Sequence, residues 1–342
     1  MTGRDRIQAL LEGKAADRPP FAPAVYEHKA ALIGRTPSEI ARSAALLERA
    51  LLREYEVYGA DVLTVGVDVY NVEAEAAGAR VRFPSSNDVP SIEARPLGPG
   101  EEVRGRKIPD PEKNGRMPVF LEAGRRVQSE LGRTVFIRGA LCAPFSLACE
   151  LVGPEEVLMA LLDRPEWSVS LLDYCAEIVK AYGRGFVGRG LGIVLFDSHA
   201  SPPLVSPDLY RRIILPPTSR VVSFFRNDLG IPLVPYIMGG DTALLLDSLL
   251  ATGTNAILCD FKADLRFFVE RLKTTDVLLR ANLDPGFLLQ ASLSEIETRA
   301  RVVLEAGRIH PRFMLGTGIL PYDLPPDKVL AVRRALEEVL PS

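Results

Sequence analysis

Short apolar segments recur along the chain and alternate with longer amphipathic stretches. Eight such segments, each seven or eight residues long, cover positions 20–26, 61–68, 134–141, 192–198, 232–239, 255–261, 277–284 and 312–319. Stretches with a helical spacing of apolar residues, such as PPDKVLAVRRALEEVL near the C-terminus, lie between them. This alternation predicts a parallel sheet covered by helices. Eight strand–helix units in a chain of 342 residues fit a single (β/α)8 TIM barrel, of the α/β class, better than an open doubly wound sheet.

Two segments depart from the alternating pattern. The N-terminal stretch MTGRDRIQALLEG is expected to form an amphipathic helix, and its internal charges are not those of a signal peptide. Residues 83–118 are rich in Pro, Gly and charged residues, which predicts a long loop inserted after the second strand. Because loops of this length are often lids or substrate-binding edges, we expect it to border the functional site.

Composition narrows the range of partners. The chain has 41 basic and 44 acidic residues, a net charge of −3, with no block of like charge, so a general nucleic-acid-binding surface is not expected. The four cysteines show no CxxC spacing, which favours reduced thiols in the core over a disulfide framework. No apolar run approaches the roughly 20 residues that span a bilayer. We therefore expect a cytoplasmic protein that acts on a small molecule, without a membrane segment.

The candidate site residues are the polar and ligand-facing side chains at the ends of the predicted strands, because catalytic residues of TIM barrels lie at the C-terminal ends of the strands. In chain order they are Tyr26, His28, Lys29, Asp68, Tyr70, Asp197, Ser198, His199, Tyr236, Met238, Asp241, Asn282 and Thr317. Two of the three histidines of the chain belong to this set. Gly239 and Gly240 would let the backbone after VPYIM approach a ligand in the barrel mouth.

Some of these residues have a structural interpretation as well. Asp241 precedes TALLLDSLL and is as well placed to cap a helix as to contact a ligand. Asn282 lies in NLDP, which also fits a turn that satisfies loop amides. Asp68 ends an apolar strand and is followed by mostly apolar residues, so a buried carboxylate there needs a partner or a chemical task. We therefore favour a functional role for Asp68.

Motifs along nearly the whole chain resemble those of the uroporphyrinogen decarboxylase superfamily. GADVLTVGVDVYNVEAEAAG is similar to the segment that carries the catalytic aspartate of the family, which falls on Asp68. GALCAPFSLACELVG resembles GAPFTLA, VLFDSHASPP resembles the FDSHAG strand, ANLDPGFLL resembles GNLDP, and LGTGILPYD resembles the closing GHG or GCG strand. The resemblance implies a TIM barrel and one of two chemistries. One is decarboxylation of uroporphyrinogen, and the other is methyl transfer between corrinoid proteins and thiols or other methyl carriers.

The chain departs from the decarboxylase pattern at several positions. AVYEHK stands where the family has MRQAGR, so Val25 and Lys29 replace two arginines that hold substrate carboxylates. Glu150 replaces a tyrosine, and Thr317 replaces a late histidine. Because a polycarboxylate substrate needs cationic partners, the loss of an arginine and the gain of an acid disfavour uroporphyrinogen as the substrate.

The zinc ligands of the thiol methyltransferases are also replaced. Tyr236, Met238 and Thr317 stand at the positions of the His and the two Cys ligands that the resemblance implies. Zinc in proteins is bound by His, Cys or carboxylate side chains, so we predict no metal site through these three residues.

The resulting prediction is a methyltransferase without the thiol-activating zinc. NVEAEAAGARV is closer to the methyltransferase branch, and the chain shows no DxHxxG-type motif, so a corrinoid would be carried by a partner protein and no cofactor would be bound tightly. Asp68, His28 or His199 would protonate the leaving group, while Glu150 or Glu73 would shape the pocket. The alternative is a cofactor-free decarboxylase of uroporphyrinogen or a related pyrrole carboxylate, in which Asp68 would stabilise the pyrrole cation. Formation of a homodimer stays open.

Overall fold

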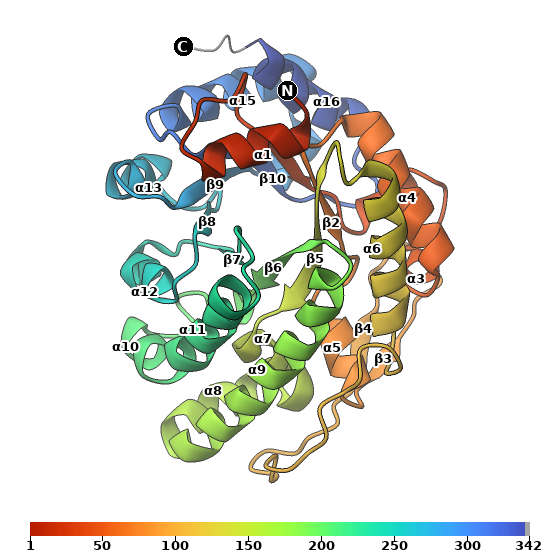
Figure 1. Ribbon diagram of the computed structural model, residues 1–342, viewed down its shortest axis with the longest axis vertical. Coiled ribbons are helices and arrows are strands. Elements are labelled where there is room, and N and C mark those ends of the chain that lie inside the picture. The colour runs from red at the N-terminus through yellow and green to blue at the C-terminus, as the bar shows by residue number, and fades with distance from the viewer. Residues whose placement is uncertain (339–342) are drawn as a thin grey trace.

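The structure is a computed structural model, and it describes residues 1–338. Eight strands form one parallel sheet in the order β1-β10-β9-β8-β7-β6-β5-β2 and curve into a nearly closed barrel surrounded by helices (Figure 1). The strands are β1 (Phe21–Ala24), β2 (Val62–Val65), β5 (Phe136–Cys142), β6 (Gly192–Phe196), β7 (Pro235–Ile237), β8 (Ala256–Cys259), β9 (Leu278–Leu283) and β10 (Phe313–Ile319). Each lies within or overlaps one of the eight apolar segments, so the predicted TIM barrel is confirmed.

Helices follow the strands and cover the outside of the barrel. They are α1 (Gly3–Leu11), α2 (His28–Ala31), α3 (Pro37–Ile40), α4 (Ala44–Tyr58), α5 (Asn71–Ala76), α6 (Met117–Leu131), α7 (Pro144–Val152), α8 (Pro154–Asp163), α9 (Pro165–Val187), α10 (Pro207–Leu209), α11 (Leu215–Ser223), α12 (Leu246–Ala251), α13 (Leu265–Leu272), α14 (Pro285–Gln290), α15 (Leu293–Gly307) and α16 (Pro326–Glu337). No helix in residues 1–338 is long and apolar enough to cross a membrane.

The predicted N-terminal helix is α1, and it closes one end of the barrel. Thr2 caps α1 in a capping box with Asp5, which satisfies the first free amides of the helix. Its apolar residues Ile7 and Leu10 pack against side chains at the starts of the strands, among them Val62 and Met314. The starts of the strands are thereby covered, and the opposite end of the barrel remains as the mouth.

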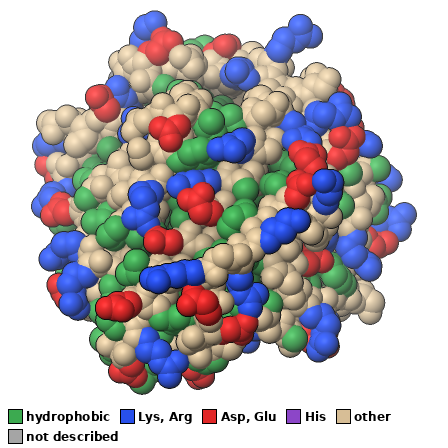
Figure 2. Space-filling view, turned by 60° about the horizontal axis from the view of Figure 1, so that its bottom comes forward, with side chains coloured by type: hydrophobic (Ala, Val, Ile, Leu, Met, Phe, Trp, Pro, Cys, Tyr) green, Lys and Arg blue, Asp and Glu red, His purple; other side chains and the backbone are tan. Residues whose placement is uncertain are grey.

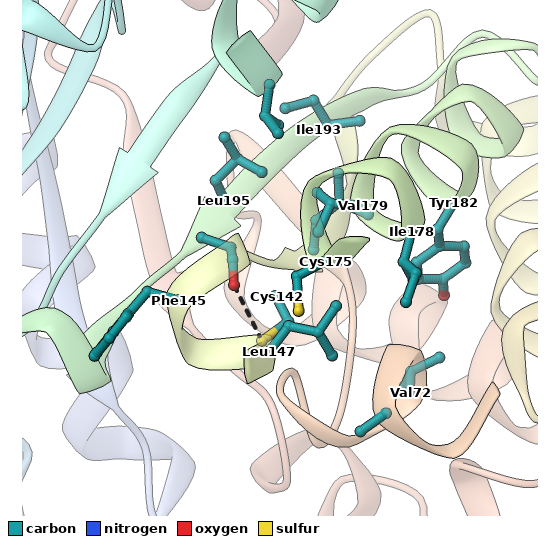
Figure 3. Packing of buried hydrophobic residues seen from close by; sticks show 14 of the residues in the cluster. Val72, Cys142, Phe145, Leu147, Cys175, Ile178, Val179, Tyr182, Ile193 and Leu195 are labelled. Atoms are coloured by element: carbon teal, nitrogen blue, oxygen red, sulfur yellow. Dashed lines mark hydrogen bonds between the residues drawn. The ribbon is translucent and has the colours of Figure 1, made fainter. Parts of the chain in front are cut away.

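The largest part of the core lies between the sheet and the helices outside β5 and β6. Residues of β5, β6, α5, α7 and α9 pack together there, with Cys142 and Cys175 side by side among Leu, Ile and Val side chains (Figure 3). All four cysteines are buried and none forms a disulfide. The expected burial of the cysteines in the core is therefore confirmed.

The inserted segment is only partly a loop. Within it β4 (Ser91–Ala94) pairs with β3 (Arg80–Arg82) in an antiparallel two-stranded sheet, which the expectation of a plain loop over 83–118 missed. Leu97 donates a backbone hydrogen bond to the carbonyl of Leu151 in α7, so the segment is attached to the helix that follows β5. The face of the molecule in Figure 2 carries acidic and basic side chains interspersed, as the absence of charge blocks predicted.

Candidate active site

The ends of β2, β6 and β7 meet at the mouth of the barrel. Tyr70, two residues after Asp68, lies edge-on to the ring of His199, with 5.5 Å between the ring centroids. The backbone amide of Ser198 donates to the hydroxyl of Tyr70 at 3.4 Å, and the amide of Gly239 donates to the hydroxyl of Ser198 at the same distance. These contacts place three of the predicted strand ends beside one another.

Asp68 is held by an arginine that the sequence analysis did not single out. Arg116, the residue before α6, donates to both carboxylate oxygens of Asp68 at 3.0 and 2.7 Å and also forms an ion pair with Glu75. The side chain of Asp68 is only 1% exposed. Asn71 donates a further, longer hydrogen bond to Asp68 at 3.3 Å. Asp68 therefore has the partner that its burial requires, and the geometry assigns it first to the attachment of the inserted segment.

Glu150 and His199 form a second pair at the mouth, and this pair remains partly open to solvent. Glu150 Oε1 lies 3.6 Å from His199 Nε2, and the side chains are 15% and 28% exposed. Burial raises the pKa of Glu150 to about 7, against a weaker opposing effect of Arg95. Burial and the charge of Arg95 both lower the pKa of His199, so the imidazole is neutral at neutral pH. The pair therefore combines an acid that titrates near pH 7 with a neutral base.

Glu73 is a third acid near the mouth, but it is fully buried. One carboxylate oxygen accepts a hydrogen bond from the backbone amide of Cys142 at 2.7 Å, and the other has no partner among the described residues. Burial raises the pKa of Glu73 to about 8, and the negative charge of Asp68 adds to this effect. Glu73 is therefore largely protonated at neutral pH.

Asp197 and Tyr236 belong to a buried hydrogen-bond network. Asp197 accepts hydrogen bonds from the amide and hydroxyl of Ser146 and from the hydroxyl of Tyr236 at 2.5 Å. The hydroxyl of Tyr236 in turn accepts from Tyr210. These bonds fix β6, α7 and β7 relative to one another, and neither Asp197 nor Tyr236 has more than 1% of its surface exposed. Their role as substrate contacts stays a prediction, whereas their structural role is visible.

Two predicted residues of the first strand end are directed into protein contacts. His28 Nδ1 donates to the carbonyl of Pro321 at 2.9 Å, and Nε2 accepts from the hydroxyl of Tyr58 at 2.6 Å. Both ring nitrogens are thus occupied, which leaves the imidazole without a free site for proton transfer in this arrangement. These contacts give His28 a structural role, and its catalytic role stays a prediction.

Lys29, which was predicted to bind substrate, also makes structural contacts, and its role in binding stays a prediction. It is completely buried, and Nζ donates to the carbonyls of Thr64 and Gly66 while pairing with Glu54 at 3.3 Å. The strand ladder is not continuous between β1 and β2 within residues 1–338. Lys29 therefore supplies donors to carbonyls of β2 at the seam of the barrel, where a neighbouring strand would otherwise donate.

The remaining predicted residues lie on β7, β9 and β10 or close to their ends. Asp241 is exposed and accepts from the amide of Ala243, which matches its capping interpretation. Thr317 accepts from the amide of Ala24, and Met238 is 1% exposed. Tyr236, Met238 and Thr317 are thus buried or engaged by protein groups, and their chemistry does not fit a zinc ion.

Arg95 and Arg116 are the residues near the mouth that the sequence analysis missed. Both come from the inserted segment, at positions without helical or strand periodicity. A signal was nevertheless present, because a buried acid at the end of β2 requires a cation, and the insertion that follows β2 is rich in arginine.

Comparison with known proteins agrees with this architecture. The family model described as uroporphyrinogen decarboxylase (URO-D) matches residues 2–339. The chain belongs to the uroporphyrinogen decarboxylase family. Its relatives in this family carry two different reactions in their names.

A methylcobamide:CoM methyltransferase, MtaA of Methanosarcina barkeri, is 25% identical over 90% of each chain. A uroporphyrinogen decarboxylase of Syntrophotalea carbinolica is 28% identical over 84% of this chain and 82% of the relative. A solved structure of a methyltransferase from Methanosarcina mazei has a TM-score of 0.88 at 23% identity and covers 99% of both chains, which supports the fold. Members of the family are enzymes, and the relatives do not distinguish the two reactions for this chain.

Proposed function

We propose that this protein transfers a methyl group from a small methylated substrate to a corrinoid carried by a partner protein, and that a protonated side chain at the barrel mouth activates the leaving group. The pair formed by Glu150 and His199 is the observation that carries the proposal. Glu150 lies at a position occupied in the decarboxylases by a tyrosine, and its pKa near 7 makes it a proton donor at neutral pH.

The proposed reaction needs one proton for the leaving group. In a methyl ether, the bond between the methyl carbon and the ether oxygen breaks, and the methyl group passes to the acceptor. The ether oxygen keeps the bonding electrons and takes the proton of Glu150, which is then restored from solvent. A corrinoid, when bound, supplies the nucleophile that accepts the methyl group. His199 is neutral and next to Glu150, so it orients the proton and relays it to and from solvent.

The zinc-dependent thiol mechanism has no support from the side chains present. Zinc activates a thiol by binding it as a thiolate, which requires two or three firm protein ligands. The hydroxyl of Tyr236 donates a hydrogen bond to Asp197, and the hydroxyl of Thr317 accepts one from the backbone amide of Ala24. Acid assistance at the leaving group needs no metal ligand, and Glu150 can supply the proton.

Decarboxylation of uroporphyrinogen is the competing reaction within the family. In that reaction Asp68 would stabilise a cationic pyrrole, so its carboxylate would have to face the substrate. Here both oxygens of Asp68 accept hydrogen bonds from Arg116, and Glu150 adds an acid to the mouth. These two features favour methyl transfer over decarboxylation.

An anaerobic assay with two substrates distinguishes these reactions. Methoxyacetate and methylthioacetate, methyl donors with oxygen and sulfur leaving groups, are incubated with the protein and with reduced free cobalamin as acceptor, and methylcobalamin is measured. We expect protein-dependent formation of methylcobalamin from at least one donor and none from boiled protein. Absence of methylcobalamin together with decarboxylation of uroporphyrinogen at an enzymatic rate would contradict the proposal.

A further inference from the structure

Two arginines lie inside the barrel, below the mouth. Arg138 is in the middle of β5 and Arg280 in the middle of β9, and they are only 2% and 3% exposed. Side chains alternate along a strand, so they share the inner face with Ala140 and Asn282, which lie one layer closer to the mouth. Ala140 packs in the cluster that fills the upper interior of the barrel.

Neither guanidinium group has a carboxylate partner within salt-bridge distance among residues 1–338. Arg138 Nε donates to the hydroxyl of Thr64 at 3.1 Å, and Arg280 Nη2 donates to the carbonyl of Thr317 at 2.9 Å. Arg280 Nε is buried without any hydrogen-bond partner. Asp260 is the acid whose charge acts on Arg280, but it forms no ion pair with it. Two positive charges are therefore buried with neutral partners only.

This arrangement is costly and differs from the other deeply buried cations of the chain. Lys29 is paired with Glu54, and Arg116 is paired with Asp68 and Glu75. An unpaired buried charge is unfavourable, and the cost is removed when a counter-ion binds. Burial and, to a smaller extent, the charge of Arg280 lower the pKa of Arg138 to about 10, so Arg138 is still protonated at neutral pH. A guanidinium group keeps its proton in proteins, so Arg280 is charged as well.

The surrounding backbone makes room for these side chains. A Cβ atom on Gly316 of β10 would come within 2.4 Å of Arg280 Nε, so the guanidinium group lies against a glycine. The inner wall above the arginines is lined by Ala24 and Ala140, which keep 7% and 6% of their surface exposed although they face the interior. Asn282, above Arg280 on the same strand, has an Oδ1 atom without a partner. The level above the arginines therefore combines small apolar side chains with one unsatisfied polar atom, Asn282 Oδ1.

We propose that Arg138 and Arg280 bind an oxyanion group, a carboxylate or a sulfonate, of the small-molecule substrate. The planar guanidinium groups match the geometry of such an anion, and the anion supplies the charge that the barrel interior lacks. This inference rests on the proposed function for the identity of the ligand as a substrate, and it adds that the substrate is an acid. With the acid group held at Arg138 and Arg280, the transferred methyl group lies toward the mouth, where Glu150 and His199 are placed.

Binding can be measured without any corrinoid, so the test is independent of the methyl-transfer assay. Methoxyacetate is compared with its neutral analogue methoxyacetamide at constant ionic strength, by calorimetry and by the shift of the unfolding temperature. We expect methoxyacetate to bind and to raise the unfolding temperature, and methoxyacetamide to bind at least about tenfold more weakly. Ethanesulfonate serves as the sulfonate probe.

Variants of Arg138 and Arg280 test whether the anion binds at these two residues. Arg138→Met and Arg280→Met should each weaken methoxyacetate binding about 10- to 100-fold, as expected for a lost hydrogen bond to a charged group. Arg53→Met, in which an exposed arginine of α4 is changed, should bind like the wild type. If a Met variant does not fold, Arg138→Lys and Arg280→Lys, which keep the charge but lose the planar fork, should show a smaller loss. Equal binding of methoxyacetate and methoxyacetamide, binding that is unchanged in the arginine variants, or no binding of either anion would overturn the inference. Anion binding without methyl transfer would contradict only the proposed function.

Discussion

Arg116 and Arg280 are both buried, yet the protein surrounds them in opposite ways. Arg116 holds the end of β2 to the start of α6 through two carboxylates, so its charge is neutralised and its donors are used. Arg280 lies inside the barrel against Gly316, with one carbonyl acceptor and no carboxylate. Burial alone therefore does not identify a charged side chain as functional. The charge that lacks a partner is the one that indicates a ligand.

The largest expected effect comes from removal of the paired arginine. Arg116→Met leaves Asp68 buried without its cation, so we expect a loss of about 3–5 kcal/mol in the free energy of unfolding. Asp68→Asn should lower the free energy of unfolding by less, because Arg116 still forms its ion pair with Glu75. Urea unfolding measures both changes.

A matched control for the paired arginine lies on α6, the helix that Arg116 precedes. Arg125 of α6 is about half exposed and pairs with Glu122, so Arg125→Met should leave the free energy of unfolding nearly unchanged. If Arg116→Met were as mild as this control, the ion pair with Asp68 would not hold the inserted segment in place.

The unpaired arginine should respond with the opposite sign. Arg280→Met removes an uncompensated buried charge, so the free energy of unfolding without ligand should stay constant or rise by about 1–3 kcal/mol. The measurement is urea unfolding in buffer free of carboxylates. A loss as large as that of Arg116→Met would mean that Arg280 stabilises the fold and that the comparison is wrong.

A smaller, pH-dependent effect is expected at Glu73. Its pKa in the folded state is raised from 4.5 to about 8, so its contribution to stability is fully present below pH 4.5 and is lost as the pH rises through 8. Glu73→Gln should therefore differ from the wild type by less than about 1 kcal/mol at pH 5, since the amide keeps the acceptor for Cys142. At pH 9 the variant should be the more stable protein. Equal stability curves across this range would show that Glu73 reaches solvent when it ionises.

The fold could be predicted because each barrel strand is buried on both faces. Such strands appear as continuous apolar runs, and their order along the chain fixes the barrel. The contact between Tyr70 and His199 could be expected for the same reason, because they lie in the segments that follow β2 and β6 at one end of the barrel. The arginines inside FIRGAL and LLRANL were visible in the sequence as charges within apolar strands, but periodicity alone could not show that they lack partners.

The rest of the site depends on contacts between distant parts of the chain. Arg116 is 48 residues from Asp68, and nothing in the irregular segment between them indicates the pairing. His28 and Lys29 follow a strand end, as catalytic residues do. The carbonyl of Pro321 accepts from His28, and the carbonyl of Thr64 at the barrel seam accepts from Lys29. Local pattern identified the position of these residues, whereas tertiary packing determined their partners.

The central claim is that Glu150 protonates the leaving group in methyl transfer. The most direct test compares Glu150→Gln with the wild type on two acidic methyl donors, methoxyacetate and a nitro-substituted methoxybenzoate, with formation of methylcobalamin as the measured rate. The alkoxide leaving group of methoxyacetate needs a proton and the nitrophenolate does not. We expect the rate to fall about 10²–10⁴-fold with methoxyacetate, the usual contribution of a general acid, and less than about tenfold with the nitro donor. Equal losses with both donors, or no loss with either, would contradict it.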